Sequence, residues 1–465
     1  MTETQIKQAV EHAHSNYDTY LENFKDLLRI PSVSTDAAYK GEINRAAEWV
    51  VAELKRLGFD KCAAMPSDGH PVVYGEWLKA GEDKATIIIY AHYDVQPVDP
   101  LELWDSPPFE PEVRDGKLYA RGVVDDKIGV WGNLKAIESI MAATGTLPVN
   151  VKVFFEGEEE TGSPSMEAFI KANKDLLTAD LLIISDGGSS PGQPESWYSL
   201  RGIIGAEVNI TGSEYDLHSG IGGGVVHNPI HMAGKIIASF HDDNGHILIP
   251  GAYEGALPLT EEEREKFGAN EDDLVKSTRQ GMGDFRLWGE SEYGFVERMT
   301  ARPSLDINGV FGGYQGKGSK TVIPSKAGFK VTMRIAPGQD PLDIRQKLVD
   351  HIKSFACDTV DIDVKVEKIY GSPVLMSSEG PLVDAMNKAY KAVWDAEMLN
   401  MRIGGSIPIV GMFQQVLGFP LVFFGLGSGG LVHSPNEYMH LDYFQINIDT
   451  AIHFYHYLAD ALGKQ

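Results

Sequence analysis

Continuous apolar runs alternate with amphipathic stretches over roughly the first 190 residues of the chain. Apolar runs that fit β-strands lie near residues 72–76, 85–91, 151–155 and 181–185. Stretches with apolar side chains at helical spacing lie near residues 17–29, 47–57, 129–143 and 164–175. Unbroken apolar strands are typical of a parallel sheet that is buried on both faces, and the intervening helices supply the cover. The pattern predicts an α/β domain with a mostly parallel sheet and helices on both faces.

The pattern changes after Asp186, where a loop rich in Gly, Ser and Pro leads to Arg201-Gly202. The following block alternates in polarity like half-buried strands and contains a predicted helix over 341–355 and a polar, helix-prone insert at 260–300. From residue 370 onward, the chain returns to a helix and a buried strand. The simplest organisation is a domain formed by residues 1–201 and 369–465, interrupted by an inserted α+β domain at 202–368.

Length and charge narrow the class of protein. The chain has 465 residues, which favours two domains over one, and its 43% hydrophobic and 23% charged content is typical of a soluble globular protein. The net charge of −25 argues against a nucleic-acid or anionic-membrane partner, because both require a basic surface. We interpret the acidic surface mainly as a solubility feature.

Cysteine content and the absence of long apolar segments indicate the compartment. Cys62 and Cys357 are the only cysteines, so a disulfide framework is not expected and a reducing cytosol is favoured. Residues 1–15 show no apolar core of a signal peptide. No apolar stretch approaches the ~18 residues that cross a bilayer. The sequence predicts a cytoplasmic protein without a membrane partner.

Residues able to bind metals follow the predicted buried strands. They are His92 and Asp94, the acidic run Glu158-Glu159-Glu160, Asp186, and, beyond a glycine-rich turn, His433. Asp125 comes from a further segment that precedes a predicted helix. Ligands of open α/β sheets gather at the carboxyl ends of the strands. Two histidines and three carboxylates suit a pair of divalent ions, and a carboxylate between two ions ~3.5–4 Å apart forms a clamp for hydrolysis.

Each of these residues, taken alone, also has a structural explanation. Asp125 could cap the following helix, the acidic run could be a solvated loop, and His433 could be a loop histidine. The spacing of His92 and Asp94 points both side chains the same way, which fits a metal ligand and its orienting carboxylate. Three carboxylates directly after a buried strand are costly without a cation. The combination therefore favours a metallohydrolase.

Five motifs resemble those of the M20 family of di-metal peptidases. The resemblance extends over nearly the whole chain, includes the inserted domain, and is closest to the branch of cytosolic non-specific dipeptidases and carnosinases. The motifs are His92-Tyr93-Asp94-Val95-Gln96-Pro97, Tyr119-Ala120-Arg121-Gly122-Val123-Val124-Asp125-Asp126-Lys127, Glu156-Gly157-Glu158-Glu159-Glu160-Thr161-Gly162-Ser163, Ser185-Asp186 and Leu431-Val432-His433-Ser434-Pro435-Asn436-Glu437.

The resemblance implies a metal site with two divalent ions per chain. His92 and Asp186 would hold one ion, Glu160 and His433 would hold the other, and Asp125 would bridge both. Zn²⁺ is favoured, although Mn²⁺ and Co²⁺ accept the same ligand types.

The resemblance also implies the reaction, which is hydrolysis of short peptides by a broad-specificity dipeptidase. Asp94 would orient the histidine ligand, and Glu159 would be the general base. An N-acyl-amino-acid deacylase or a carboxypeptidase of the same family is the alternative, and a catalytically inactive scaffold is a remote one. Aspartate at position 186 favours the dipeptidase, because glutamate there goes with carboxypeptidase and acylase members. The segment 370–373 lacks the histidine of some carnosinase-like enzymes, which disfavours carnosine as preferred substrate.

The inserted domain would be a lid that forms a homodimer. By resemblance, His218 would reach the active site of the partner subunit, while Thr321 and Arg334 from the lid and Ser406 from the catalytic domain would contact the substrate. The strand around Arg334 supports this role separately, because its apolar residues occupy one face and leave Arg334 on the other. A guanidinium there could bind the terminal carboxylate of a peptide through two hydrogen bonds.

Overall fold

The computed structural model describes residues 1–269, 271–368 and 370–463. Residue 369, at which the second part of the first domain was predicted to begin, and residues 464–465 lie outside the described ranges. The chain forms two compact units. The first unit comprises Met1–Tyr198, Met376–Met401 and Met412–Gln465, and the second comprises Ser199–Leu375 and Arg402–Gly411. The segment Arg402–Gly411 was expected in the first domain. Ser406 therefore lies in the second unit and not, as predicted, in the first.

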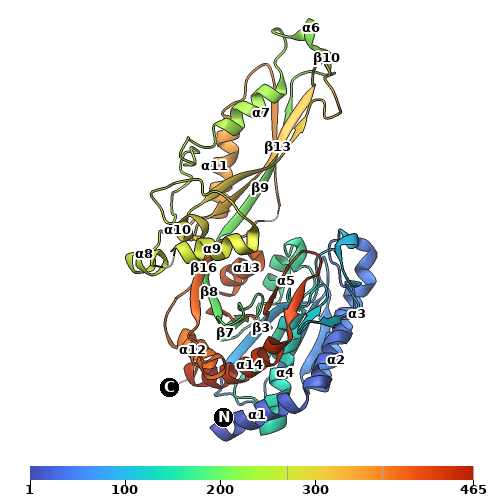
Figure 1. Ribbon diagram of the computed structural model, residues 1–465, viewed down its shortest axis with the longest axis vertical. Helices are drawn as coiled ribbons and strands as arrows, with labels where there is room; N and C mark the ends of the chain where they lie inside the picture. Colours follow the sequence, from blue (N-terminus) through green and yellow to red (C-terminus); the bar gives the residue numbers. More distant parts are fainter. Residues whose placement is uncertain (270, 369, 464–465) are drawn as a thin grey trace. The chain divides into compact units, whose positions relative to one another are not determined.

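A six-stranded sheet forms the centre of the first unit (Figure 1). In spatial order its strands are β1 (Asp60–Met65), β2 (Val72–Trp77), β6 (Asn150–Glu156), β3 (Thr86–His92), β7 (Leu181–Ile184) and β17 (Leu421–Phe423). The last four run parallel to one another, while β2 is antiparallel to both β1 and β6. The carboxyl ends of β6, β3, β7 and β17 therefore share one edge of the sheet.

Helices cover both faces of this sheet. One face, with Ile87 and Ile89, packs in a single core with α1 (Glu3–Ser15), α2 (Tyr17–Leu28), α3 (Lys40–Arg56), α4 (Lys127–Thr144), α12 (Pro381–Trp394) and α14 (Leu441–Ala461). On the other face, Phe154 contacts Phe169 of α5 (Met166–Ala172) and Phe413 of α13 (Pro408–Leu417). The α/β class with helices on both faces is thus confirmed.

Short strands complete the first unit, and some of them lie where the chain passes from one unit to the other. A four-stranded sheet joins β18 (Gly429–Gly430), β19 (Tyr438–His440), β5 (Lys117–Tyr119) and β4 (Glu112–Arg114). The chain passes between the units within β8 (Glu195–Leu200), β16 (Leu399–Ile403) and α13, and directly after β15 (Val374–Leu375). Short 3₁₀ turns occur at η1 (Ala37–Tyr39), η2 (Leu101–Leu103) and η3 (Glu159–Thr161).

The second unit is built on an antiparallel sheet. Its strands are β11 (Ser304–Gly312), β13 (Lys326–Ile335), β9 (Gly202–Thr211) and β14 (Asp361–Val366). The apolar face packs on α7 (Pro229–Ala238) and α11 (Pro341–Lys353). The remaining elements are β10 (Leu217–His218), β12 (Val322–Ile323), α6 (Ser219–Gly222), α8 (Glu261–Gly268), α9 (Glu271–Met282) and α10 (Phe295–Thr300). Helices packed on one face of an antiparallel sheet form an α+β arrangement.

Some elements lacked a clear sequence pattern. Helix α1 is mostly polar and buries only Ile6, Ala9 and Ala13, and it begins at a capping box formed by Thr2 and Gln5. Strand β1 at the edge of the sheet is largely exposed, so its pattern is weak. Within the described ranges, no helix combines the length and apolar character that a membrane crossing requires.

Candidate metal centre

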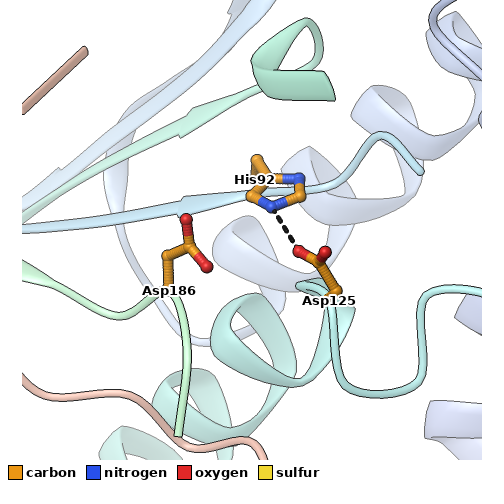
Figure 2. A group of neighbouring side chains, drawn as sticks. All are labelled: His92, Asp125 and Asp186. Carbon is orange, nitrogen blue, oxygen red and sulfur yellow. Dashed lines mark hydrogen bonds and ion pairs between the residues drawn. The ribbon is translucent and has the colours of Figure 1, made fainter. Parts of the chain in front are cut away.

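The strand ends bring the predicted ligands together in the first unit. His92 is the last residue of β3 and pairs in register with Glu156 at the end of β6. Asp186 lies two residues beyond the end of β7. Asp125 comes from the loop before α4 and faces His92 and Asp186 (Figure 2). The shared edge of parallel strands therefore concentrates these side chains, as the sequence predicted.

Asp125 is the common member of two groups of candidate ligands. Its Oδ1 lies 3.0 Å from Nε2 of His92, and its Oδ2 lies 2.8 Å from Nε2 of His433. The same nitrogen of His433 lies 3.2 Å from Oε2 of Glu160. The ligand atoms of His92, Asp125 and Asp186 lie within 4.8 Å of one another, as do those of Asp125, Glu160 and His433. Two cation positions that share one carboxylate fit this arrangement.

Asp94 holds both the histidine and the acidic turn. His92 Nδ1 lies 3.3 Å from Asp94 Oδ1 and 3.1 Å from the Asp94 carbonyl oxygen. The Asp94 carboxylate also accepts hydrogen bonds from the backbone amides of Glu159, at 3.3 Å, and Glu160, at 3.1 Å. His92 and Asp94 are fully buried. This one carboxylate therefore fixes a candidate ligand ring and the turn that carries the next ligand.

Two acidic residues of the 156–160 segment have structural roles. Glu156 accepts a hydrogen bond of 2.6 Å from the Tyr90 hydroxyl. The Glu158 carboxylate accepts hydrogen bonds from the Ser165 backbone amide (2.7 Å), the Ser165 hydroxyl (2.6 Å) and the His70 backbone amide (2.9 Å). These donors are neutral protein groups, and neither carboxylate belongs to the two groups of candidate ligands.

Glu159 and Glu160 differ from these neighbours. Glu160 Oε2 accepts a hydrogen bond of 2.8 Å from Gln96, but its buried Oε1 has no hydrogen-bond partner among the described residues. A buried carboxylate with one oxygen 3.2 Å from His433 Nε2 and the other oxygen unpaired fits a metal ligand. Within the described ranges, no side-chain hydrogen bond of Glu159 is formed either. The structure therefore separates a carboxylate in the cluster, Glu160, from an uncommitted neighbour, Glu159.

The electrostatics of the cluster test its fit to cations. Burial and the nearby Asp125 carboxylate raise the pKa of Asp186 to about 7. Burial, together with the charge of Asp186, raises the pKa of Glu159 well above its usual range. Hydrogen bonds with Asp125 and Glu160 raise the pKa of His433 to about 10. The raised pKa values of Asp186, Glu159 and His433 share one contributing cause, an excess of negative charge in the cluster. Divalent cations would offset this charge and accept these nitrogen and oxygen ligands.

A buried ion pair that sequence reasoning missed joins the ligand loops. The Glu437 carboxylate accepts hydrogen bonds from Arg121 Nη1 (2.7 Å) and from the backbone amides of Gly122 (3.0 Å), Val124 (2.9 Å) and Asp125 (3.2 Å). Arg121 also donates to the Pro97 carbonyl oxygen at 2.9 Å. The loop that carries His433 therefore holds the loop that carries Asp125. Arg121 and Glu437 each lie in one of the five family motifs. No sequence pattern near either residue indicates that the two form a pair in the folded chain.

The second unit contains the predicted substrate-contacting residues as two pairs. Arg334 Nη1 donates to the Ser406 hydroxyl at 2.7 Å. His218 on β10 pairs in register with Val322 on β12, next to Thr321, and both predicted residues are exposed. His218 Nδ1 accepts a hydrogen bond of 3.0 Å from the Gly220 backbone amide. In the neutral ring this arrangement leaves the proton on Nε2.

The two pairs lie at opposite ends of the second unit. Thr211 pairs with Lys326 at one end of the β9–β13 ladder, and Ile203 pairs with Arg334 at the other. Eight residue steps along β13 separate these ends by about 26 Å. Strand β10 lies beyond the Thr211 end, as Figure 1 shows. Within one chain, His218 is therefore far from Arg334.

Comparison with known proteins gives matches along most of the chain. The sequence profile of peptidase family M20/M25/M40 matches residues 88–457. Cys-Gly metallodipeptidase DUG1 of Candida albicans is 32% identical over 468 aligned positions, which cover 95% of each chain. The structure of the M20 family metallo-carboxypeptidase Sso-CP2 from Sulfolobus solfataricus superimposes with a TM-score of 0.84 at 31% identity, covering 95% of this chain and 99% of the other. That of human carnosine dipeptidase 1 superimposes with a TM-score of 0.81 at 27% identity, covering 98% and 99%.

Proposed function

The chain belongs to peptidase family M20/M25/M40, and on that premise we propose that it is a metal-dependent dipeptidase of broad specificity. The observation that carries the proposal is the pair of ligand groups that share Asp125 at the carboxyl edge of the sheet. The similarity to a Cys-Gly metallodipeptidase supports short peptides as substrates.

Two divalent ions per chain complete the proposed centre. His92 and Asp186 would hold one, Glu160 and His433 the other, and Asp125 would contact both. Zn²⁺ is the favoured ion, with Mn²⁺ and Co²⁺ as alternatives that suit the same ligands. Bound at these positions, the ions would supply an acidified water nucleophile and polarise the scissile carbonyl group.

The side chains around the centre perform the proton transfers. We assign Glu159 as general base, because it follows the buried strand β6 beside the ligand Glu160 and makes no side-chain hydrogen bond among the described residues. Asp94 fixes the backbone of this turn, so the Glu159 carboxylate starts from a defined position. It takes a proton from the attacking water and returns it to the leaving amine. Asp94 also holds the ring of His92.

Arg334 is proposed to bind the C-terminal carboxylate of the peptide. The Ser406 hydroxyl accepts from Arg334 and donates to the Arg201 carbonyl oxygen at 2.6 Å, which fixes the position of the guanidinium. Desolvation lowers the pKa of Arg334, and in the described ranges no ion pair neutralises it. A planar, unpaired guanidinium suits a carboxylate, so the free C-terminus of a dipeptide would be selected.

His218 and Thr321 are proposed to act on the partner subunit of a homodimer. A dipeptide spans only about 7 Å, whereas the ladder that separates the two pairs of the second unit is itself about 26 Å long, so one substrate molecule does not reach both pairs in the same chain. The proton on Nε2 would make His218 of the partner subunit a donor to the developing oxyanion. The second unit would thus serve as lid and dimerisation domain, and the first as catalytic domain.

Two further features belong to the proposal. Both cysteines, Cys62 and Cys357, are free, which supports a reducing cytoplasm as the location. The net charge of −25 supports small-molecule substrates rather than nucleic acid.

A carboxypeptidase is the second candidate, because the structure of the M20 carboxypeptidase Sso-CP2 superimposes closely. The test is an assay of the purified protein, loaded separately with Zn²⁺, Mn²⁺ and Co²⁺, on four substrates: dipeptides, their C-terminal amides, tripeptides and N-acetyl amino acids. We expect dipeptides to be cleaved best and the amides about 10- to 100-fold less well. Efficient release of the C-terminal residue from tripeptides would favour the carboxypeptidase, and cleavage of N-acetyl amino acids alone the deacylase. No hydrolysis with any ion would favour a scaffold.

A further inference from the structure

A cavity of about 320 Å³ opens beside two of the candidate ligands in the first unit. Asp125 and Asp186, drawn in Figure 2, form part of its wall. The wall also includes Val124, Glu195, Trp197 and Val432, together with Gly187 and Gly427. This volume matches a pocket for one large side chain or a small ligand.

The backbone and an indole ring give the cavity a fixed shape. Gly187 has φ +92°, and a Cβ atom there would overlap the ring of Trp197, so only glycine fits beside the indole. The Gly427 amide donates to the Gly187 carbonyl oxygen at 3.0 Å, and the Ser189 amide donates to the Gly427 carbonyl oxygen at 2.8 Å. Trp197 packs on Phe423 with ring centroids 5.6 Å apart. The aromatic wall therefore exists before any ligand enters.

One acidic side chain of the wall, Glu195, is not a candidate metal ligand. Glu195 is half-buried, its backbone amide donates to the Ser189 hydroxyl at 3.0 Å, and burial raises the pKa of its carboxyl group. Among the residues the structure describes, none of the lining side chains is basic, and no basic side chain pairs with Glu195. The aspartates of the cavity belong to the proposed metal centre. Glu195 is thus a partly desolvated negative charge that a cationic ligand would compensate.

We propose that this cavity binds the side chain of the N-terminal residue of the substrate and selects a long side chain that ends in a cation, as in lysine or arginine. This assignment rests on the proposed dipeptidase function, in which Arg334 takes the C-terminal end. The aliphatic stem packs against Val124 and Val432 at the wall. The cationic group meets the Trp197 ring and the Glu195 carboxylate, both of which attract positive charge.

The test compares two substrates that differ only in charge. Lys-Gly and norleucyl-glycine share the same aliphatic stem, and only the first ends in an ammonium group. We expect kcat/KM of the unmodified enzyme to favour Lys-Gly by about 10- to 100-fold. Glu195→Gln should remove most of this preference, because the amide lacks the negative charge that the ammonium group would meet. Trp197→Leu, which keeps an apolar wall, should also reduce the preference. Glu379→Gln is the control, because Glu379 is exposed and lines a separate cavity of the same unit.

Three outcomes overturn the assignment. If the unmodified enzyme cleaves norleucyl-glycine at least as well as Lys-Gly, the cavity does not select a cation, although dipeptidase activity stands. If Glu195→Gln slows both substrates equally, Glu195 binds the α-ammonium group that all dipeptides share. If neither dipeptide is cleaved with any of the three metals, the proposed function itself fails.

Discussion

Two pairs of candidate functional residues, one pair in each unit, are held in opposite ways. In the first unit, His92 and Asp94 are fully buried, and hydrogen bonds tie them to the turn that carries Glu159 and Glu160. In the second unit, His218 and Thr321 are exposed. A metal site requires ligands fixed in advance, whereas a group that meets the substrate requires access. The difference fits the proposed function, in which the first unit holds the metal ions and the second contributes groups that contact the substrate.

This comparison predicts different effects of substitution. Changes at the candidate ligands and the general base of the first unit should alter metal content or turnover, and changes at His218 and Arg334 in the second unit should alter the use of substrate without loss of metal.

Asp125→Ala should have the largest effect, because this carboxylate contacts histidines of both ligand groups. We expect loss of bound metal and a fall in activity of about 10³-fold or more, as the ions supply several kcal/mol of transition-state stabilisation. Elemental analysis of the purified protein and a dipeptide assay measure the two effects. Glu158→Gln is the matched control, since its hydrogen bonds come from Ser165 and His70, and it should keep its metal. Two ions bound to the Asp125→Ala variant would contradict the shared position.

Glu159→Gln should separate turnover from metal binding. Loss of a general base lowers kcat by about 10²- to 10⁴-fold, while the metal content should stay at the level of the unmodified protein. Glu160→Gln, one residue away, should lose metal as well as activity. Metal loss in the first variant with retention in the second would reverse the two assignments.

The sequence predicted the strand ends of the site because the physics there is local. The apolar runs near 85–91 and 151–155 correspond to β3 (Thr86–His92) and β6 (Asn150–Glu156), and polar residues directly after them could be located at the sheet edge. The ion pair of Arg121 and Glu437 could not be predicted, because no pattern links residues that pair only in the folded chain.

The placement of Ser406 was wrong for a related reason. The chain enters the second unit again at Arg402–Gly411, within β16 and α13, where neither composition nor polarity changes. This segment belongs to the second unit because of contacts that form only in the folded chain, such as the Arg334–Ser406 hydrogen bond. The mostly polar helix α1 was missed because its small apolar side is defined only by what it packs against.

Glu437→Gln should weaken metal binding although Glu437 is not a candidate ligand. The buried Arg121 would lose its charged partner, and the loop of Asp125 would lose part of its support. Loss of a group that orients ligands reduces metal affinity by about 10- to 100-fold. Competition with a chelator measures this affinity in the folded variant.

Its matched control is Glu290→Gln in the second unit, where Arg302 donates two hydrogen bonds, of 2.8 and 2.6 Å, to the glutamate. Breaking either buried pair should destabilise the protein by about 3–5 kcal/mol in thermal or denaturant unfolding. Only the variant in the first unit should bind metal more weakly. Equal metal affinity in both variants would reduce the Arg121–Glu437 pair to a structural role.

The smallest expected effect appears when two weakened variants are mixed. Arg334→Ala and His218→Ala should each reduce kcat/KM by about 10- to 100-fold without loss of metal, since each removes one polar contact with the substrate. If His218 acts on the partner subunit, a dimer with one subunit of each variant contains one intact site. That site combines Arg334 of one subunit with His218 of the other. Random exchange of equal amounts makes half of the dimers mixed, so about one quarter of the unmodified activity should return.

Subunit exchange is checked by separating differently tagged dimers. Exchange without recovery of activity would place His218 in its own subunit's site or outside the reaction, and the second unit would then recognise substrate through Arg334 and Ser406 alone.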